Sequence, residues 1–186
     1  MSEEQRKKRG KTYGIFGPMF AGKSEELMRR ARRSEVSENS FVIIKPRCDS
    51  RSPPDTIESH NKNCMKALST ETLLDIKDDD LDVGFIYIDE GQFFPDLIDF
   101  CRKMEEKGKR IHVAMLDATF EGKPFPGTEG IHALCYEYVK IHAVCMNCKN
   151  KPAHLTKRIG DSTSIREVGG KDKYLAVCGT CFYLDE

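Results

Sequence analysis

Short apolar runs alternate with amphipathic stretches along most of the chain. The runs are rich in β-branched and aromatic residues, which predicts strands at 11–16, 41–44, 83–88, 110–116 and 138–144. Between them, apolar side chains recur at helical spacing, which predicts helices at 24–33, 69–76 and 95–107. Strands that are apolar on both faces and alternate with helices are typical of a parallel sheet covered on both sides. We therefore expect an α/β fold with a mostly parallel sheet and helices on both faces.

The pattern changes in two places. Residues 47–66 contain Pro53, Pro54 and a polar stretch, which predicts a loop. After Val144 the chain is dominated by Cys, Gly, Lys and Thr, and only short strand-like pieces such as 164–168 remain. We therefore expect three parts: a flexible tail over 1–10, an α/β domain over 11–144 and a smaller domain over 145–186.

Composition and charge narrow the possible functions. The chain has 186 residues, of which 39% are hydrophobic, and this excludes a disordered protein. No apolar run approaches the roughly 18 residues that a membrane helix needs, so we expect no membrane partner. The charged N-terminus does not resemble a secretory signal, so the eight cysteines indicate a reducing, cytoplasmic location. Lys plus Arg is 30 and Asp plus Glu is 30, and this balance argues against a nucleic-acid partner.

A phosphate-binding motif follows the first predicted strand. The pattern G-x-x-x-x-G-K-[ST] is matched by Gly17, Pro18, Met19, Phe20, Ala21, Gly22, Lys23 and Ser24. The backbone N–H groups of such a loop bind phosphate oxygens, and the start of the next helix adds positive potential. Lys23 would reach the β- and γ-phosphates, and Ser24 would bind Mg²⁺. The motif lies between a predicted strand and a predicted helix, which is the context that it requires.

A pair of carboxylates stands at the end of a later strand. Asp89 follows the apolar run 83–88, where a Walker-B aspartate would lie, and Glu90 comes next. Adjacent side chains at a strand end diverge, so Asp89 could hold the metal while Glu90 faces the acceptor. A carboxylate there can take the proton from an attacking hydroxyl.

Two Cys-x-x-Cys pairs indicate a metal site near the C-terminus. They are Cys145 with Cys148 and Cys178 with Cys181. Four thiolates at this spacing can bind Zn²⁺ tetrahedrally, and with no open position the zinc would be structural. Two disulfides or an iron–sulfur cluster are the competing interpretations. The metal would join the two ends of the 149–177 loop, which could then serve as a lid.

Taken together, these motifs resemble the type II thymidine kinases, the family of the cytosolic thymidine kinases. The similarity covers residues 11 to 183. The matching segments are 17–24, 49–51, 88–94, 116–120, both cysteine pairs and 169–174. The resemblance implies a P-loop NTPase-like fold with a small C-terminal zinc-ribbon lid, or lasso. It also implies ATP-dependent phosphorylation of the 5′-hydroxyl of thymidine or deoxyuridine, homotetramers, and feedback inhibition by thymidine triphosphate (dTTP).

The resemblance also assigns roles to individual residues. Glu90 corresponds to the general base. The ATP and phosphate group comprises residues 17–24 with Asp49, Ser50, Arg51, Asp89 and Gln92. The thymidine group comprises Met19, Phe93, Leu116, Phe120, Thr156, Ile165, Arg166, Glu167, Val168, Gly169 and Tyr174. Mg²⁺ with ATP and structural Zn²⁺ are the implied cofactors.

Two other functions share some of these motifs. A nucleotide-switched, zinc-ribbon nucleic-acid-binding protein would also carry a phosphate loop and two cysteine pairs. The zero net charge and a chain too short for a second motor lobe argue against it. A small-molecule kinase for another acceptor would use the same phosphate chemistry, and only the pocket residues distinguish it.

Overall fold

The computed structural model describes residues 9–50, 52–58, 63–160 and 169–184. Its centre is a six-stranded sheet in the order β5-β2-β6-β7-β1-β8. The strands are β1 (Lys11–Phe16), β2 (Phe41–Pro46), β5 (Leu68–Thr70), β6 (Phe85–Ile88), β7 (Arg110–Met115) and β8 (Glu137–Lys140). All neighbouring pairs are parallel, which confirms the expected fold class. The carboxyl ends of the strands therefore share one edge, where ligands bind in such folds.

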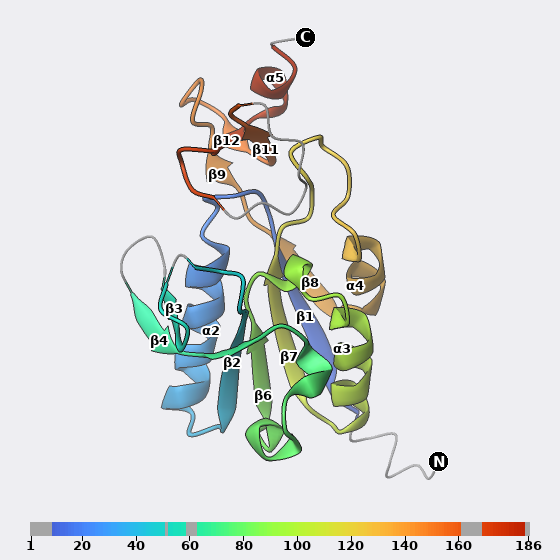
Figure 1. Ribbon diagram of the computed structural model, residues 1–186. Coiled ribbons are helices and arrows are strands. Elements are labelled where there is room, and N and C mark those ends of the chain that lie inside the picture. Colours follow the sequence, from blue (N-terminus) through green and yellow to red (C-terminus); the bar gives the residue numbers. More distant parts are fainter. Residues whose placement is uncertain (1–8, 51, 59–62, 161–168, 185–186) are drawn as a thin grey trace.

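Helices cover both faces of this sheet (Figure 1). Helix α2 (Lys23–Val36) packs on one face, and α3 (Leu97–Glu106) and α4 (Thr128–Leu134) pack on the other. Neighbouring strand residues point to opposite faces, so Ile15 joins the core beneath α2 while Phe16 joins the core beneath α3. Ile43 and Ile44 divide in the same way. This two-sided burial explains why the strands are continuous apolar runs.

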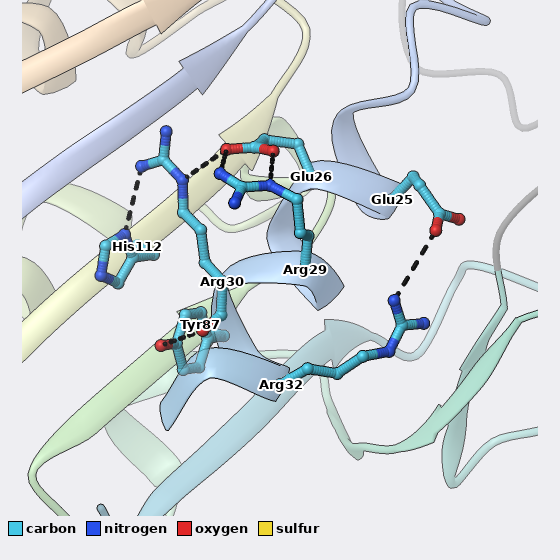
Figure 2. Close-up of polar contacts among 7 residues, drawn as sticks. All are labelled: Glu25, Glu26, Arg29, Arg30, Arg32, Tyr87 and His112. Carbon is cyan, nitrogen blue, oxygen red and sulfur yellow. Dashed lines mark hydrogen bonds and ion pairs between the residues drawn. The ribbon is translucent and has the colours of Figure 1, made fainter. Parts of the chain in front are cut away.

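A polar network holds α2 against the sheet (Figure 2). Arg30 donates to Glu26 at 2.8 Å and to Nδ1 of His112 on β7 at 3.4 Å. The hydroxyl of Tyr87 on β6 donates to the Arg30 carbonyl at 3.1 Å. The Arg29 guanidinium, hydrogen-bonded to Glu26, lowers the pKa of that carboxyl to about 2 against the opposing effect of burial. These contacts fix the orientation of the helix that begins at the phosphate loop.

The C-terminal part is built from small antiparallel pairs. Strand β9 (Ala143–Val144) pairs with β10 (Pro152–Ala153), and β11 (Leu155–Arg158) pairs with β12 (Tyr174–Val177). The short helix α5 (Gly179–Phe182) follows. These elements lie beyond the carboxyl edge of the sheet, at the top of Figure 1. They have a small core of their own, which includes Cys145, Cys178 and Cys181.

Several local predictions were wrong. The helix expected at 69–76 is instead strand β5 followed by the short 3-10 helix η1 (Leu73–Asp75). Residues 68–70 form the sheet edge beside β2, and the Asp96 carboxylate accepts hydrogen bonds from the N–H groups of Leu73 and Leu74. Tertiary contacts therefore outweigh the local helical spacing there.

Other differences concern segments that local pattern did not resolve. The expected loop at 47–66 contains the antiparallel strands β3 (Thr56–Glu58) and β4 (Cys64–Lys66). The strand expected at 138–144 divides into β8 and β9. Helix α4 was missed because Gly130 interrupts its apolar pattern. The glycine allows α4 to pack closely on α3, since a Cβ there would lie 2.4 Å from the Ile98 side chain. The piece at 164–168 lies outside the described residues.

Two further 3-10 helices complete the described elements, η2 (Asp78–Leu81) and η3 (Gly91–Phe93). Within the parts of the chain that the structure describes, no helix combines the length and apolar character needed to cross a membrane. The domain boundary near residue 144 remains a prediction, although the change from the parallel sheet to antiparallel pairs occurs at that point.

Candidate active site

The phosphate loop connects β1 to α2, at the carboxyl edge of the sheet. Gly17 has φ 152°, and a Cβ there would lie 2.3 Å from the Ile141 carbonyl oxygen, so only glycine fits. Gly22, with φ 85°, turns the chain into the helix. The Lys23 ammonium is buried and donates to the Pro18 carbonyl at 2.7 Å. The lysine therefore folds back along its own loop, close to where phosphate oxygens would be bound.

Ser24 and Asp89 meet at the start of this helix. The Ser24 hydroxyl lies 2.9 and 3.1 Å from the two carboxylate oxygens of Asp89, and Asp89 is only 3% exposed. A hydroxyl and a carboxylate are the oxygen ligands that P-loop proteins offer to Mg²⁺. The donor set therefore suits a magnesium ion that is coordinated mainly by phosphates and water.

Glu90 lies directly after Asp89 with an unusual backbone. It adopts the left-handed region, with φ 51° and ψ 44°, and is 8% exposed. Gly91 follows, and a Cβ there would lie 2.8 Å from a Val113 methyl group, so the chain passes close against β7. A non-glycine residue in this region costs about 1–3 kcal/mol, and such strain is concentrated at functional sites.

Gln92 connects this carboxylate to the next strand. Its amide nitrogen donates to Glu90, and its amide oxygen accepts the backbone N–H of Leu116 at 3.1 Å. Gln92 is 2% exposed. The structure thus places Gln92, which was expected among the phosphate-binding residues, between the expected base and an expected wall of the thymidine pocket.

Several residues expected to contact thymidine come together above the phosphate loop. The hydroxyl of buried Thr156 on β11 accepts the backbone N–H of Met19 at 3.0 Å. Phe120 follows β7, and Tyr174 begins β12. Arg158 bridges these two, lying 4.1 Å from the centre of the Phe120 ring and donating to the Tyr174 hydroxyl. Residues far apart in the sequence therefore surround one region.

The remaining expected site residues are placed as follows. Phe93 is half-buried in η3 beside buried Phe94. Asp49 is 7% exposed after β2, and Ser50 is exposed. Gly169 lies within the described part of the chain. The residues that lie outside the described part are Arg51, Ile165, Arg166, Glu167 and Val168.

The four paired cysteines form a cluster suited to zinc. The sulfur atoms of Cys145, Cys148, Cys178 and Cys181 all lie within 4.8 Å of one another, and none of the four forms a disulfide. Burial disfavours the Cys145 thiolate, but backbone N–H groups of Cys178, Cys148 and Asn147 stabilise it and lower the pKa of Cys145 to about 6. Four converging sulfurs with backbone donors fit a tetrahedral Zn²⁺ site.

Comparison with known proteins agrees with this arrangement. A sequence model of the family described as thymidine kinase matches residues 10–182. The cytosolic thymidine kinase of Homo sapiens is 43% identical over 177 residues, which cover 95% of this chain and 75% of that protein. The chain belongs to the thymidine kinase family.

Avian and viral members are similarly close. The cytosolic thymidine kinase of Gallus gallus is 41% identical over 175 residues, covering 94% of this chain and 78% of that protein. The thymidine kinase of Vaccinia virus (strain Western Reserve) is 44% identical over 168 residues, covering 90% of this chain and 94% of that protein. The similarity therefore spans both the sheet and the cysteine-rich part of this thymidine kinase.

Two residues of this thymidine kinase have contacts that the sequence did not indicate. From the sequence, Arg158 could as well contact phosphate as lie in a solvated turn; in the structure it packs between Phe120 and Tyr174. Lys45 is 1% exposed, and its ammonium donates to Ser52 and to carbonyls of the segment that follows β2. Lys45 directly follows the apolar run 41–44, and these acceptors allow its burial, since a buried lysine needs several.

Proposed function

We propose that this protein transfers the γ-phosphoryl group of ATP to the 5′-hydroxyl of thymidine, and of deoxyuridine, in pyrimidine deoxynucleotide salvage. One observation carries the proposal beyond family membership. The phosphate loop, a serine–aspartate pair and a strained glutamate converge at one edge of the sheet. This is the set of groups that in-line phosphoryl transfer requires: a phosphate cradle, metal ligands and a base.

The phosphates of ATP would lie along residues 17–24. Their backbone N–H groups and the Lys23 ammonium would bind the β- and γ-phosphates. Asp49, Ser50 and Arg51 would approach from the segment after β2, which buried Lys45 holds in place. Mg²⁺, held by Ser24 and Asp89, would neutralise charge that develops on the phosphates.

Glu90 would act as the general base. As the thymidine 5′-oxygen bonds to the γ-phosphorus, its proton passes to the Glu90 carboxylate and the bond to the β-phosphate oxygen breaks, leaving ADP. Asp89 is committed to Ser24 in the structure, so the two neighbouring carboxylates have separate partners. Glu90 adopts the left-handed backbone region directly after Asp89, and its carboxylate accepts a hydrogen bond from Gln92.

The nucleoside would bind between the sheet edge and the C-terminal strands. Arg158 holds Phe120 and Tyr174 together in the structure, and Thr156 contacts Met19. The proposed pocket residues are Met19, Phe93, Leu116, Phe120, Thr156, Gly169, Tyr174 and, outside the described residues, Ile165, Arg166, Glu167 and Val168. Aromatic and apolar side chains suit a pyrimidine base, which stacks and excludes water.

The cysteine-rich part would serve as a lid that structural zinc holds in shape. Residues 145–186 would form this lid domain and residues 11–144 the nucleotide-binding domain. Most of the tail expected over 1–10 lies outside the described residues. A closed lid excludes water from the γ-phosphate, which limits wasteful hydrolysis of ATP. We further propose that the protein forms a homotetramer in the cytoplasm. We also propose that dTTP inhibits it, since dTTP carries both the thymine base of the substrate and a triphosphate.

An ADP-release assay tests the activity directly. The purified protein is supplied with Mg²⁺ and ATP and is given thymidine, deoxyuridine, deoxycytidine or no acceptor. We expect ADP release that depends on thymidine, with deoxyuridine as a second acceptor. Hydrolysis that is equal with every nucleoside would contradict the proposal, and salt-sensitive binding to DNA in the same preparation would favour the zinc-ribbon alternative.

A further inference from the structure

Gln92 is the buried link between two parts of the proposed site. Its side chain contacts the Glu90 carboxylate on one side and the Leu116 backbone on the other. Glu90 follows β6 and Leu116 follows β7, so one amide spans the ends of two adjacent strands. The side chain is 2% exposed, which leaves almost none of its surface open to a ligand.

The orientation of this amide is fixed by its neighbours. A backbone N–H can only donate, so the Gln92 atom that faces Leu116 is the amide oxygen. The amide NH₂ group therefore faces Glu90, whose ionised carboxylate can only accept. Turning the amide over would bring two donors together on one side and two acceptors on the other.

The Glu90 carboxylate needs such a restraint. A glutamate side chain has several rotatable bonds, and a general base works only within hydrogen-bond reach of the proton that it removes. Gln92 contacts both this carboxylate and the backbone at Leu116, where the expected pocket wall begins. The position of the base is therefore coupled to the position of the expected pocket wall.

We propose that Gln92 is a positioning residue, which fixes the Glu90 carboxylate relative to the nucleoside pocket at Leu116. This inference rests on the proposed kinase activity, with Glu90 as its base. If Gln92 positions Glu90, replacing it should lower kcat. If Gln92 instead contacted the ATP phosphates, replacing it should raise the KM for ATP.

Two substitutions separate positioning from simple support of the fold. Gln92→Met keeps the length of the side chain but makes neither hydrogen bond. Gln92→Glu keeps an oxygen for the Leu116 N–H but places a second carboxylate against Glu90. Two adjacent carboxylates do not both ionise readily, so this variant supports Leu116 while impairing the base.

The test compares kcat and KM for thymidine and for ATP in the wild type, both variants, Glu90→Gln and the double variant Glu90→Gln/Gln92→Met. We expect kcat to fall about tenfold to a hundredfold in both Gln92 variants, with the KM for ATP within about threefold of wild type. In the Glu90→Gln background, adding Gln92→Met should lower kcat by no more than about twofold, because the base is already absent.

The chain offers a matched control. The Asn63 amide donates to the Glu25 carboxylate at 3.1 Å on the surface, so Asn63→Leu also removes an amide–carboxylate hydrogen bond. That variant should keep the wild-type kcat. Thermal unfolding of all variants identifies any that fail to fold, and Gln92→Glu retains the polar core contact if Gln92→Met does not fold.

Three results would overturn the inference. A raised KM for ATP with unchanged kcat would make Gln92 a phosphate ligand. Full activity in Gln92→Met would show that neither hydrogen bond of Gln92 is needed for turnover. If Gln92→Met lowered kcat by the same factor in the Glu90→Gln background as in the wild type, Gln92 would act independently of Glu90. An inactive wild type would instead contradict the proposed function itself.

Discussion

The Ser24 hydroxyl donates to the Asp89 carboxylate, with its oxygen 2.9 and 3.1 Å from the two carboxylate oxygens. Ser24 lies in the first turn of α2, directly after the loop that follows β1, and Asp89 directly follows β6, two positions from β1 in the sheet. The parallel sheet brings them together because every strand ends at the same edge. The pair that we propose as magnesium ligands is therefore assembled by topology from residues that are distant in the sequence.

Removing the Asp89 charge should weaken the use of magnesium. Asp89→Asn keeps the size of the side chain and a hydrogen-bond acceptor for Ser24, but it loses the negative charge that attracts the ion. We expect the rate at saturating ATP to fall about a hundredfold and its Mg²⁺ dependence to shift to higher concentration. The measurement is kinase rate against Mg²⁺ at constant ATP. The exposed Asp99→Asn serves as control, and identical magnesium curves for both variants would contradict the assignment.

Removing the proposed base should separate binding from turnover. Glu90→Gln retains the shape and hydrogen-bonding capacity of the side chain but cannot take a proton at neutral pH. We expect kcat to fall by about 10²–10⁴-fold while thymidine still binds with near wild-type affinity. Calorimetric titration with thymidine and the ADP-release rate measure the two quantities on the same protein. An unchanged rate would show that Glu90 is not the base.

The sequence predicted the groups that lie in contiguous motifs. Lys23, Ser24 and Asp89 were assigned from local pattern, because a phosphate loop and a Walker-B strand end are each encoded within a few residues. The parallel sheet was predicted for a similar reason, since two-sided burial produces apolar runs such as 41–44. Physical requirements that act over short distances along the chain leave short-range signals.

The contacts between distant residues could not be predicted in this way. The hydrogen bond from Met19 to Thr156 joins residues 137 positions apart, and the bond from Leu116 to Gln92 joins residues 24 apart. No local pattern encodes such pairs. The helix expected at 69–76 was wrong for the same reason, because the edge of β2 and the Asp96 carboxylate decide the structure there.

The cysteine cluster should affect the phosphate loop as well as the lid. Phe20 of the loop packs against the core that contains Cys145, Cys178 and Cys181. Cys145→Ser should therefore lose bound zinc, weaken thymidine binding several-fold and raise the KM for ATP. Metal content by mass spectrometry and thymidine titration provide the measurement, with the exposed Cys48→Ser as control. Normal thymidine affinity in zinc-free Cys145→Ser protein would contradict this coupling.

A narrower change isolates the contact between lid and loop. Thr156→Val keeps the β-branched shape but removes the oxygen that accepts the Met19 N–H. We expect the KM for thymidine to rise roughly fivefold, corresponding to about 1 kcal/mol for a buried hydrogen bond, with zinc content unchanged. Thr156→Ser restores the hydroxyl and should recover most of the loss. If the Val and Ser variants had the same KM for thymidine, the hydrogen bond from Met19 to Thr156 would not contribute to thymidine binding.

His112 should make folding stability depend on pH. Burial, and then the charges of Arg30 and Arg110, lower the pKa of His112 to about 4, against the opposing charge of Glu26. Arg30 donates to Nδ1, which also favours the neutral ring (Figure 2). In the unfolded chain the histidine takes up a proton near its ordinary pKa of 6.5, while the folded form resists protonation until about pH 4. Stability should therefore fall as the pH decreases from about 6.5 to about 4.

The size of this effect can be measured by denaturant unfolding across that pH window. A pKa difference of this size corresponds to at most about 3 kcal/mol of unfolding free energy. His112→Gln should flatten the profile between these two pH values, whereas the exposed His142→Gln should retain it. Glu26 contributes little to the pH dependence above about pH 5, because its pKa is lowered from 4.5 to about 2 and its contribution is lost mainly below that range. If His112→Gln and wild type lose stability in parallel, another group causes the pH dependence, and the half-buried His112 is not its source.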